Sequence, residues 1–244
     1  MGFDQVSEIQ DPLFGKPFVL SIGPQKCGAE WIDNYLRQRG DVCLPEDVKE
    51  VFYFDRHYQR GPAFYISHFN PQDHHRLVME VSTTAFDAPQ APEHVFALFG
   101  HDVQLLCPLR HPVQRAIRVY QDYLKYGIVQ GSFEEAVAQA PQILHASRYS
   151  EHLKHWIDQF GAGAIKFVFA QDIETQPAAF AQNLCKYLSL PYEPPKNEPA
   201  HPDETLPALD KNDLAWVQNQ LGEEIEKVQN LCGFTVRQWE PPDA

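Results

Sequence analysis

A short apolar segment, followed at once by a glycine-bounded loop and a helical pattern, limits the folds that are open to this chain. Residues 17–22 (PFVLSI) are almost continuously apolar, which predicts a strand buried on both faces, as in a parallel sheet. The loop 23–28 (GPQKCG) follows, and beyond it apolar residues recur at helical spacing from Trp31 to Leu36. We therefore expect a strand, a tight loop and a helix in direct succession.

The rest of the chain alternates between strand patterns and helical patterns. This alternation predicts a single α/β domain over residues 1–244, with a central parallel sheet flanked by helices. We expect an N-terminal extension at 1–16, a loop at 191–211, and a C-terminal helix and tail at 212–244. Further strands are expected at 76–81, 103–109 and 164–169, and further helices at 92–99, 112–126, 148–160, 176–190 and 212–231, with another after Ser132.

The charge of the chain is acidic and unevenly distributed. The 33 Asp and Glu residues against 20 Lys and Arg give a net charge of −13, which disfavours nucleic acid and anionic membranes as partners. Residues 101–130 carry a net charge of +2, which leaves −15 for the remainder. A basic segment on an acidic body favours a compact anionic ligand.

Cysteine usage and hydropathy bear on the compartment in which the protein works. The five cysteines are odd in number and include no CxxC pair, so we expect neither a disulfide framework nor a zinc site. The first 16 residues lack the apolar run of a signal peptide, and no segment approaches the roughly 20 apolar residues of a membrane span. These features predict a cytoplasmic protein. We also expect no metal site, because His152 and His155 lack an evident third ligand.

The loop 23–28 has the composition of a phosphate cradle. Its terminal glycines let backbone N–H groups approach an anion, the start of the helix adds partial positive charge, and Lys26 adds a full charge. The loop is not a Walker A motif, because no Ser or Thr follows the lysine to hold magnesium. On the pattern alone, an ordinary strand-to-helix turn with a solvated Lys26 is an equal alternative.

Several segments, in order, resemble the PAPS-dependent sulfotransferases of the carbohydrate and bacterial branch, whose donor is 3′-phosphoadenosine-5′-phosphosulfate. Residues 22–36 (IGPQKCGAEWIDNYL) resemble the 5′-phosphosulfate loop, GxxKxGT followed by an apolar helix. Residues 105–127 (LLCPLRHPVQRAIRVYQDYLKYG) resemble the 3′-phosphate segment, a strand followed by RxPxxRxxS. Residues 49–55 (KEVFYFD) resemble the KExxxFD segment. The resemblance covers nearly the whole chain and implies a P-loop-like sulfotransferase fold.

The resemblance also implies roles for individual residues. Lys26 and Glu50 match the catalytic residues: the lysine stabilises the leaving phosphate, and the glutamate takes the proton of the acceptor. Arg110 matches the arginine that binds the 3′-phosphate, while Arg118 either joins it or pairs with Asp122 one helical turn further on. The residues implied to hold PAPS, or its product PAP, are Gly23, Pro24, Gln25, Lys26, Cys27, Gly28, Ala29, Glu30, Arg110 and Arg118.

The chain departs from the family pattern at two places. Ala29 and Glu30 stand where the family has hydroxyl residues that help to hold the 5′-phosphosulfate. A lost hydrogen bond to a charged group costs roughly 1.5–3 kcal/mol, and a carboxylate aimed at the donor costs more unless it faces away. Arg118 stands at the family's serine and adds a charge that can still bind a 3′-phosphate, whereas Arg115 is expected to be structural.

The acceptor side is less strongly marked in the sequence. Glu50 is the candidate general base, and the alternative is a surface glutamate paired with Lys49. His57, His68 and His75 flank this segment and are weaker candidates for the lining of an acceptor pocket.

Three functions are compatible with these features. The first is a sulfotransferase that moves a sulfuryl group from PAPS to a hydroxyl or amine of a small-molecule acceptor, such as a natural product or small sugar. An acidic body would repel a long polyanionic glycan. The second is a non-catalytic protein of the same fold, which Ala29 and Glu30 favour. The third is a P-loop-like small-molecule kinase, which the missing Walker Ser or Thr disfavours.

Overall fold

Five parallel strands form the central sheet in the order β2–β3–β1–β4–β5. The computed structural model describes residues 13–196 and 209–239 of the chain. The central strand β1 pairs with β3 on one side and β4 on the other, so that Leu20 lies opposite both Glu80 and Leu105. The strands are β1 (Phe18–Ser21), β2 (Val42–Cys43), β3 (Leu77–Val81), β4 (Gln104–Leu109) and β5 (Ile165–Phe169).

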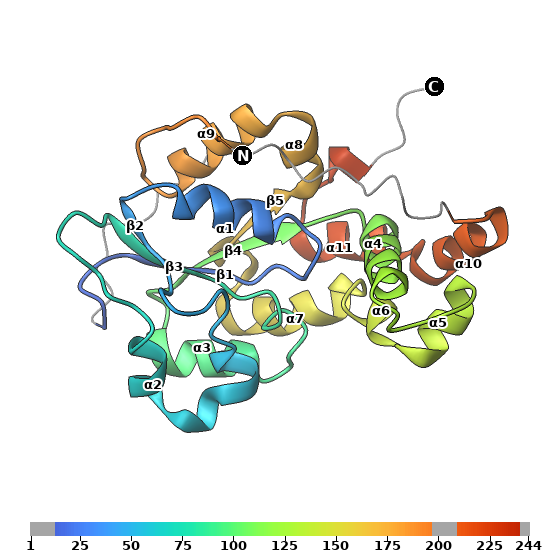
Figure 1. Ribbon diagram of the computed structural model, residues 1–244, viewed down its shortest axis with the longest axis horizontal. Coiled ribbons are helices and arrows are strands. Elements are labelled where there is room, and N and C mark those ends of the chain that lie inside the picture. Colours follow the sequence, from blue (N-terminus) through green and yellow to red (C-terminus); the bar gives the residue numbers. More distant parts are fainter. Residues whose placement is uncertain (1–12, 197–208, 240–244) are drawn as a thin grey trace.

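Helices cover both faces of this sheet and extend beyond one side of it (Figure 1). On one face lie α1 (Ala29–Arg37), α8 (Ala170–Thr175) and α9 (Pro177–Tyr187). The opposite face is covered by α2 (Pro62–Ile66), α3 (Ala91–Phe99), α7 (Tyr149–Phe160) and α11 (Glu224–Cys232). Beside the sheet lie α4 (Pro112–Lys125), α5 (Phe133–Gln139), α6 (Gln142–His145) and α10 (Lys211–Leu221). Short turns of helix occupy Tyr53–His57 (η1), Tyr58–Arg60 (η2), Ala162–Ala164 (η3) and Arg237–Trp239 (η4).

The alternation of side chains along β1 divides the core between the two faces. Val19 packs with α1 and α9, whereas its neighbours Phe18 and Leu20 pack with the aromatic side chains of α3 and of residues 53–69. A third cluster joins α4, α5, α6 and α10 and shares no residue with the other two. Three separate apolar clusters therefore hold the helices in place around the sheet.

The predicted fold class is confirmed, as are the four predicted strands, which correspond to β1, β3, β4 and β5. The single helix predicted at 212–231 is wrong, because the chain forms α10 and α11 with a break at Gly222, and glycine is a weak helix former. The strand β2 and the helices α2, α6 and α8 were not predicted. They are between two and six residues long, too short to display a periodic pattern.

The predicted terminal segments extend partly beyond the described residues. Residues 1–12, 197–208 and 240–244 lie outside them. Within the predicted extension, Phe14 is buried and stacks on Phe18 with ring centroids 5.4 Å apart, so this end of the chain contributes to the core. No helix in the described part of the chain combines the length and apolar character needed to span a membrane.

Candidate functional site

The loop 23–28 leaves the central strand β1 and enters α1, and its two glycines are required by close packing. A Cβ atom at Gly23 would lie 2.4 Å from atoms of Pro108 in β4. Gly28 has a φ of 94°, and a Cβ atom there would lie 2.5 Å from Cδ1 of Ile173 in α8. Lys26 also has a positive φ, 68°, which non-glycine residues rarely adopt. The loop is thus fixed in a conformation that its sequence does not favour locally.

Side chains from the segment after β4 hold this loop from within the protein. Nε of Arg110 donates to the carbonyl oxygen of Lys26 at 2.6 Å, and Nε of Arg115 donates to that of Gln25 at 3.2 Å. The hydroxyl of Tyr149 donates to the carbonyl of Arg110 at 3.0 Å and lies 3.5 Å from Sγ of Cys27. Arg115 is buried among these groups, which agrees with the structural role expected for it.

The predicted donor-binding residues divide into exposed and buried members. Pro24, Cys27 and Ala29 are buried, and burial raises the pKa of the Cys27 thiol. Gln25 and Lys26 are exposed at the surface of the loop. Within the loop, the side chains of these two residues are therefore accessible from solvent, while those of Pro24 and Cys27 are enclosed by the protein.

Each cation predicted for the donor site has an acidic partner. Nζ of Lys26 forms an ion pair with Asp122 in α4. Arg110 and Arg118 both donate to Oε1 of Glu174 in α8, each at 2.7 Å. The ion pair of Arg118 is thus formed with Glu174 and not with Asp122, although the negative charge of Asp122 also raises the pKa of Arg118. The sequence did not single out Glu174, since α8 was itself unpredicted.

The unusual residue Glu30 is exposed and pairs with the segment that carries Glu50. Its side chain is 74% exposed, and its carboxylate lies 3.6 Å from Nζ of Lys49. The sequence left open that Glu50 is a surface residue paired with Lys49. In the structure the ion pair of Lys49 is formed with Glu30.

The carboxylate of Glu50 is held by Thr83, which lies two residues beyond the end of β3. The backbone N–H of Thr83 donates to Oε2 of Glu50 at 2.8 Å, and the Thr83 hydroxyl donates to Oε1 at 2.9 Å. Burial raises the pKa of Glu50, although the hydrogen bonds from Thr83 oppose the shift. A carboxylate that is fixed in position and has a raised pKa is suited to accept a proton near neutral pH.

A second carboxyl group, from Glu80 in β3, lies beneath the Glu50 segment. It accepts a hydrogen bond from the N–H of Val51 at 3.1 Å and another from the hydroxyl of Tyr65 at 2.6 Å. Burial raises the pKa of Glu80 to about 7. Sequence reasoning missed this residue, although an acidic residue inside the apolar run 76–81 was a visible signal.

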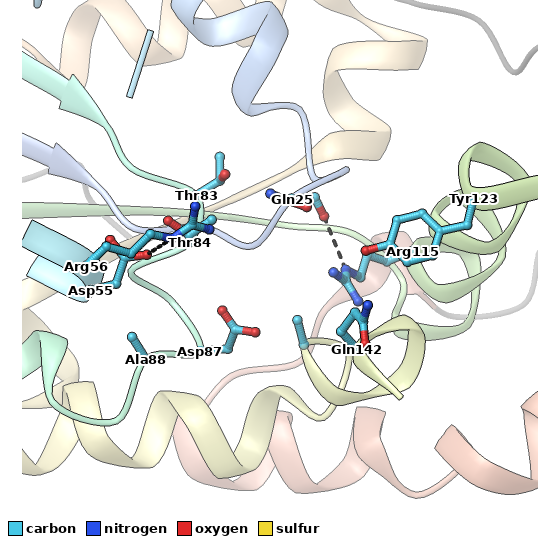
Figure 2. Close-up of a pocket in the computed structure, with 11 residues that line it drawn as sticks. Gln25, Asp55, Arg56, Thr83, Thr84, Asp87, Ala88, Arg115, Tyr123 and Gln142 are labelled. Carbon is cyan, nitrogen blue, oxygen red and sulfur yellow. Dashed lines mark hydrogen bonds and ion pairs between the residues drawn. The ribbon is translucent and has the colours of Figure 1, made fainter. Parts of the chain in front are cut away.

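A pocket of about 310 Å³ opens between this segment and α4 (Figure 2). Figure 2 shows Thr83, Thr84 and Asp55 on one side, Gln25 and Arg115 on the other, and Asp87 between them. Among the described residues, Oδ1 of Asp55 and Oγ1 of Thr84 are buried without a hydrogen-bond partner. The pocket is lined by Gln25, Asp55, Arg56, Thr83, Thr84, Asp87, Ala88, Arg115, Tyr123, Gln142 and Ala146.

The histidines proposed for an acceptor pocket lie elsewhere. His57 and His68 pack edge-on against Phe64, and Nδ1 of His75 accepts from the N–H of Gln72. None of them belongs to the pocket lining described above. Lys26 and Glu50 do not line it either, but Gln25, the neighbour of Lys26, and Thr83, the hydrogen-bond partner of Glu50, do. Over residues 13–196 and 209–239, no three His, Cys, Asp or Glu side chains are grouped as metal ligands.

Comparison with known families identifies the domain. The family described as the sulfotransferase domain matches residues 16–238. The chain belongs to this sulfotransferase family. The loop 23–28, the arginines after β4 and the Glu50 segment all lie within the matched residues.

Curated members of related sequence act on heparan sulfate according to their names. A bifunctional heparan sulfate N-deacetylase/N-sulfotransferase 1 from Caenorhabditis elegans is 28% identical over 195 residues, which cover 73% of this chain and 22% of that protein. Human heparan sulfate glucosamine 3-O-sulfotransferase 6 is 28% identical over 182 residues, covering 71% and 52%. The matched part thus spans between about a fifth and about a half of these relatives.

Solved sulfotransferases share the fold. A sulfotransferase from Alicyclobacillus acidocaldarius superposes with a TM-score of 0.74 at 19% identity, covering 92% of this chain and 98% of that one. A mouse sulfotransferase complexed with PAP gives a TM-score of 0.53 at 12% identity, covering 91% and 90%. At these identities the likeness concerns the fold alone.

Proposed function

We propose that this protein is a sulfotransferase that moves a sulfuryl group from PAPS to a hydroxyl or amine of a small acceptor. The observation that carries the proposal is the proximity of the loop with Lys26 to the Arg110–Arg118 pair, through the bond between Arg110 and the Lys26 carbonyl. Two cationic groups on adjoining strand ends suit a nucleotide with phosphates at both its 5′ and 3′ positions. A solved protein of the same fold is complexed with PAP, which supports this choice of donor.

The chemistry assigns separate tasks to Lys26 and Glu50. The acceptor oxygen or nitrogen forms a bond to sulfur while the bond from sulfur to the 5′-phosphate oxygen breaks. Glu50 takes the proton that the acceptor loses, and Lys26 stabilises the charge that develops on the departing phosphate. To do so, Lys26 must exchange its contact with Asp122 for one with the donor.

The pocket supports a small polar acceptor. Its volume of about 310 Å³ suits a single sugar or a compact natural product, not a long chain enclosed on all sides. The unpartnered oxygens of Asp55 and Thr84 can bond to acceptor hydroxyl or amine groups. The lining holds two carboxylates, of Asp55 and Asp87, and two guanidinium groups, of Arg56 and Arg115, so it carries no excess of either charge. The preference for a neutral or cationic acceptor over a polyanionic one rests on the net charge of −13 of the chain.

A second candidate is a non-catalytic protein of the same fold that binds nucleotide weakly. It is favoured by Ala29, which lacks the hydroxyl that the family uses, and by the acidic partners of Lys26, Arg110 and Arg118. Transfer activity separates this candidate from the first.

The test combines binding with transfer. PAP binding is measured by calorimetry, and transfer of labelled sulfate from PAPS is measured with amino sugars, hydroxylated natural products and a heparan-type oligosaccharide. We expect PAP to bind and the small neutral or cationic acceptors to be sulfated. PAP binding without transfer to any acceptor would favour the non-catalytic candidate, and transfer to the oligosaccharide alone would contradict the small-acceptor assignment.

A further inference from the structure

Glu174 joins two arginines that are eight residues apart in the sequence. Its Oε1 accepts from Nη1 of Arg110, which directly follows β4, and from Nη2 of Arg118 in α4, each at 2.7 Å. Glu174 itself comes from α8, which follows the neighbouring strand β5. One carboxylate oxygen therefore occupies the point on which both guanidinium groups converge.

The two guanidinium groups require an anion near them. The side chain of Arg110 is only 5% exposed and that of Arg118 is 22% exposed, so water stabilises their charges poorly. Burial, and next the proximity of Arg110, lower the pKa of Arg118, while Glu174 acts in the opposite direction. Glu174 thus supplies the negative charge that this pair of like charges needs.

A phosphate group would supply the same charge in the same way. Carboxylate and phosphate both present oxygen acceptors that match the N–H groups of arginine. A phosphate monoester carries a charge of about −1.5 to −2 at neutral pH, compared with −1 for a carboxylate. The phosphate is the stronger partner of two arginines, but it must displace a carboxylate that already bonds to both.

We propose that Glu174 is an internal competitor of the donor's 3′-phosphate for Arg110 and Arg118. The inference rests on the proposed function, because it takes that phosphate as the ligand of the two arginines. Glu174 lies in the last turn of a six-residue helix and its side chain is 26% exposed, so it can turn into water when the phosphate arrives. Its return would also help the product PAP to leave.

The test compares two nucleotides that differ in the 3′-phosphate. Binding of PAP and of adenosine 5′-phosphate is measured by calorimetry for the wild type, Glu174→Gln and Glu174→Ala. Asp158→Asn is the matched control, because it removes one acidic charge from an exposed ion pair on α7. We expect both Glu174 variants to bind PAP about tenfold more tightly, with adenosine 5′-phosphate changed less than about twofold and Asp158→Asn like the wild type.

Three results would overturn the inference. Weaker PAP binding in both Glu174 variants would show that the carboxylate orients the arginines and does not compete. Equal tightening for both nucleotides would indicate a general effect of charge. Unchanged PAP binding would show that Glu174 does not compete with the 3′-phosphate, while binding of PAP would still support the proposed function. A failure of every variant to bind PAP would remove the inference and the proposed function together.

Discussion

Nε of Arg110 donates to the carbonyl oxygen of Lys26 at 2.6 Å, so the cation assigned to the 3′-phosphate also holds the loop assigned to the 5′-phosphosulfate. The resemblance to the sulfotransferase family assigned these two residues to opposite ends of the nucleotide. The contact links the two proposed phosphate sites, so a substitution at Arg110 should alter binding at both sites.

Arg110→Ala should weaken PAP binding by roughly 10- to 100-fold, the equivalent of one or two lost charge-assisted hydrogen bonds. Because the loop loses its bond to Arg110, binding of adenosine 5′-phosphate should weaken as well. Arg118→Ala is the control, since it leaves the loop bond in place and should affect PAP alone. Unchanged PAP affinity in Arg110→Ala would mean that the 3′-phosphate assignment is wrong.

Lys26→Ala should reduce turnover more than it reduces PAP affinity. The proposed contact between Lys26 and the donor's 5′-phosphate strengthens as negative charge develops on the departing phosphate. Its loss should therefore raise the free energy of activation for transfer by more than it weakens PAP binding. We expect kcat to fall by roughly 10²–10³-fold, as for other lost stabilising contacts of this kind. Steady-state kinetics and calorimetry on the same variant check this, and an equal loss in both quantities would assign Lys26 to binding alone. Asp122→Asn, which removes the partner of Lys26, should not lower kcat.

Glu50→Gln should lower transfer at neutral pH by roughly 10²–10⁴-fold and leave PAP binding intact. Since burial raises the pKa of Glu50 and the base must be deprotonated, the wild-type rate should fall on acidification at a pH above the ordinary range of glutamate. The pH profile of kcat/KM measures this limb, which should vanish in Glu50→Gln. A near-normal rate in the variant would remove Glu50 from the mechanism, and Asp55 would become the next candidate.

Glu30→Thr should change PAP affinity less than about threefold. The carboxylate is exposed and paired with Lys49, so it imposes little repulsion on a donor at the loop. Calorimetry with PAP checks this at low and moderate salt. A large gain in affinity would show that Glu30 does oppose the donor, which would strengthen the non-catalytic reading.

Glu80 should make stability depend on pH in a defined window. Its pKa of about 7 in the folded protein lies above the ordinary 4.5, so the folded state binds the extra proton between these values and loses stability as the pH rises through them. Relative to Glu80→Gln, the wild type should lose up to about 3 kcal/mol between pH 4.5 and pH 8. Urea unfolding of both proteins at pH 5 and pH 8 measures the difference, with Asp158→Asn as control. If the difference in the free energy of unfolding between the two proteins were the same at pH 5 and pH 8, the raised pKa of Glu80 would be contradicted.

The sequence predicted most of the sheet and the loop between β1 and α1, because both depend on local patterns. The apolar run 17–22 and the glycine-bounded loop that follows it are contiguous, so a buried strand and a tight loop can be predicted from them without the rest of the chain. Glu174 and Glu80 could not be assigned in this way, because their partners lie at least 56 and 15 residues away, respectively, and depend on strand order and register. The histidines near residue 50 were misleading for the same reason: closeness in sequence did not bring them into the pocket.

The cluster formed by α4, α5, α6 and α10 has a consequence for altering which acceptor is used. It shares no apolar residue with the two clusters on the sheet, although Arg115 of α4 bonds both to the loop and to the carbonyl of Ile143, and Gln142 and Ala146 form part of the pocket wall. A protein engineer could therefore remodel this wall at Gln142 and Ala146 while leaving intact the packing of the loop against β4 and α8. Libraries at these two positions should yield variants that retain wild-type affinity for PAP and differ in the molecules they modify.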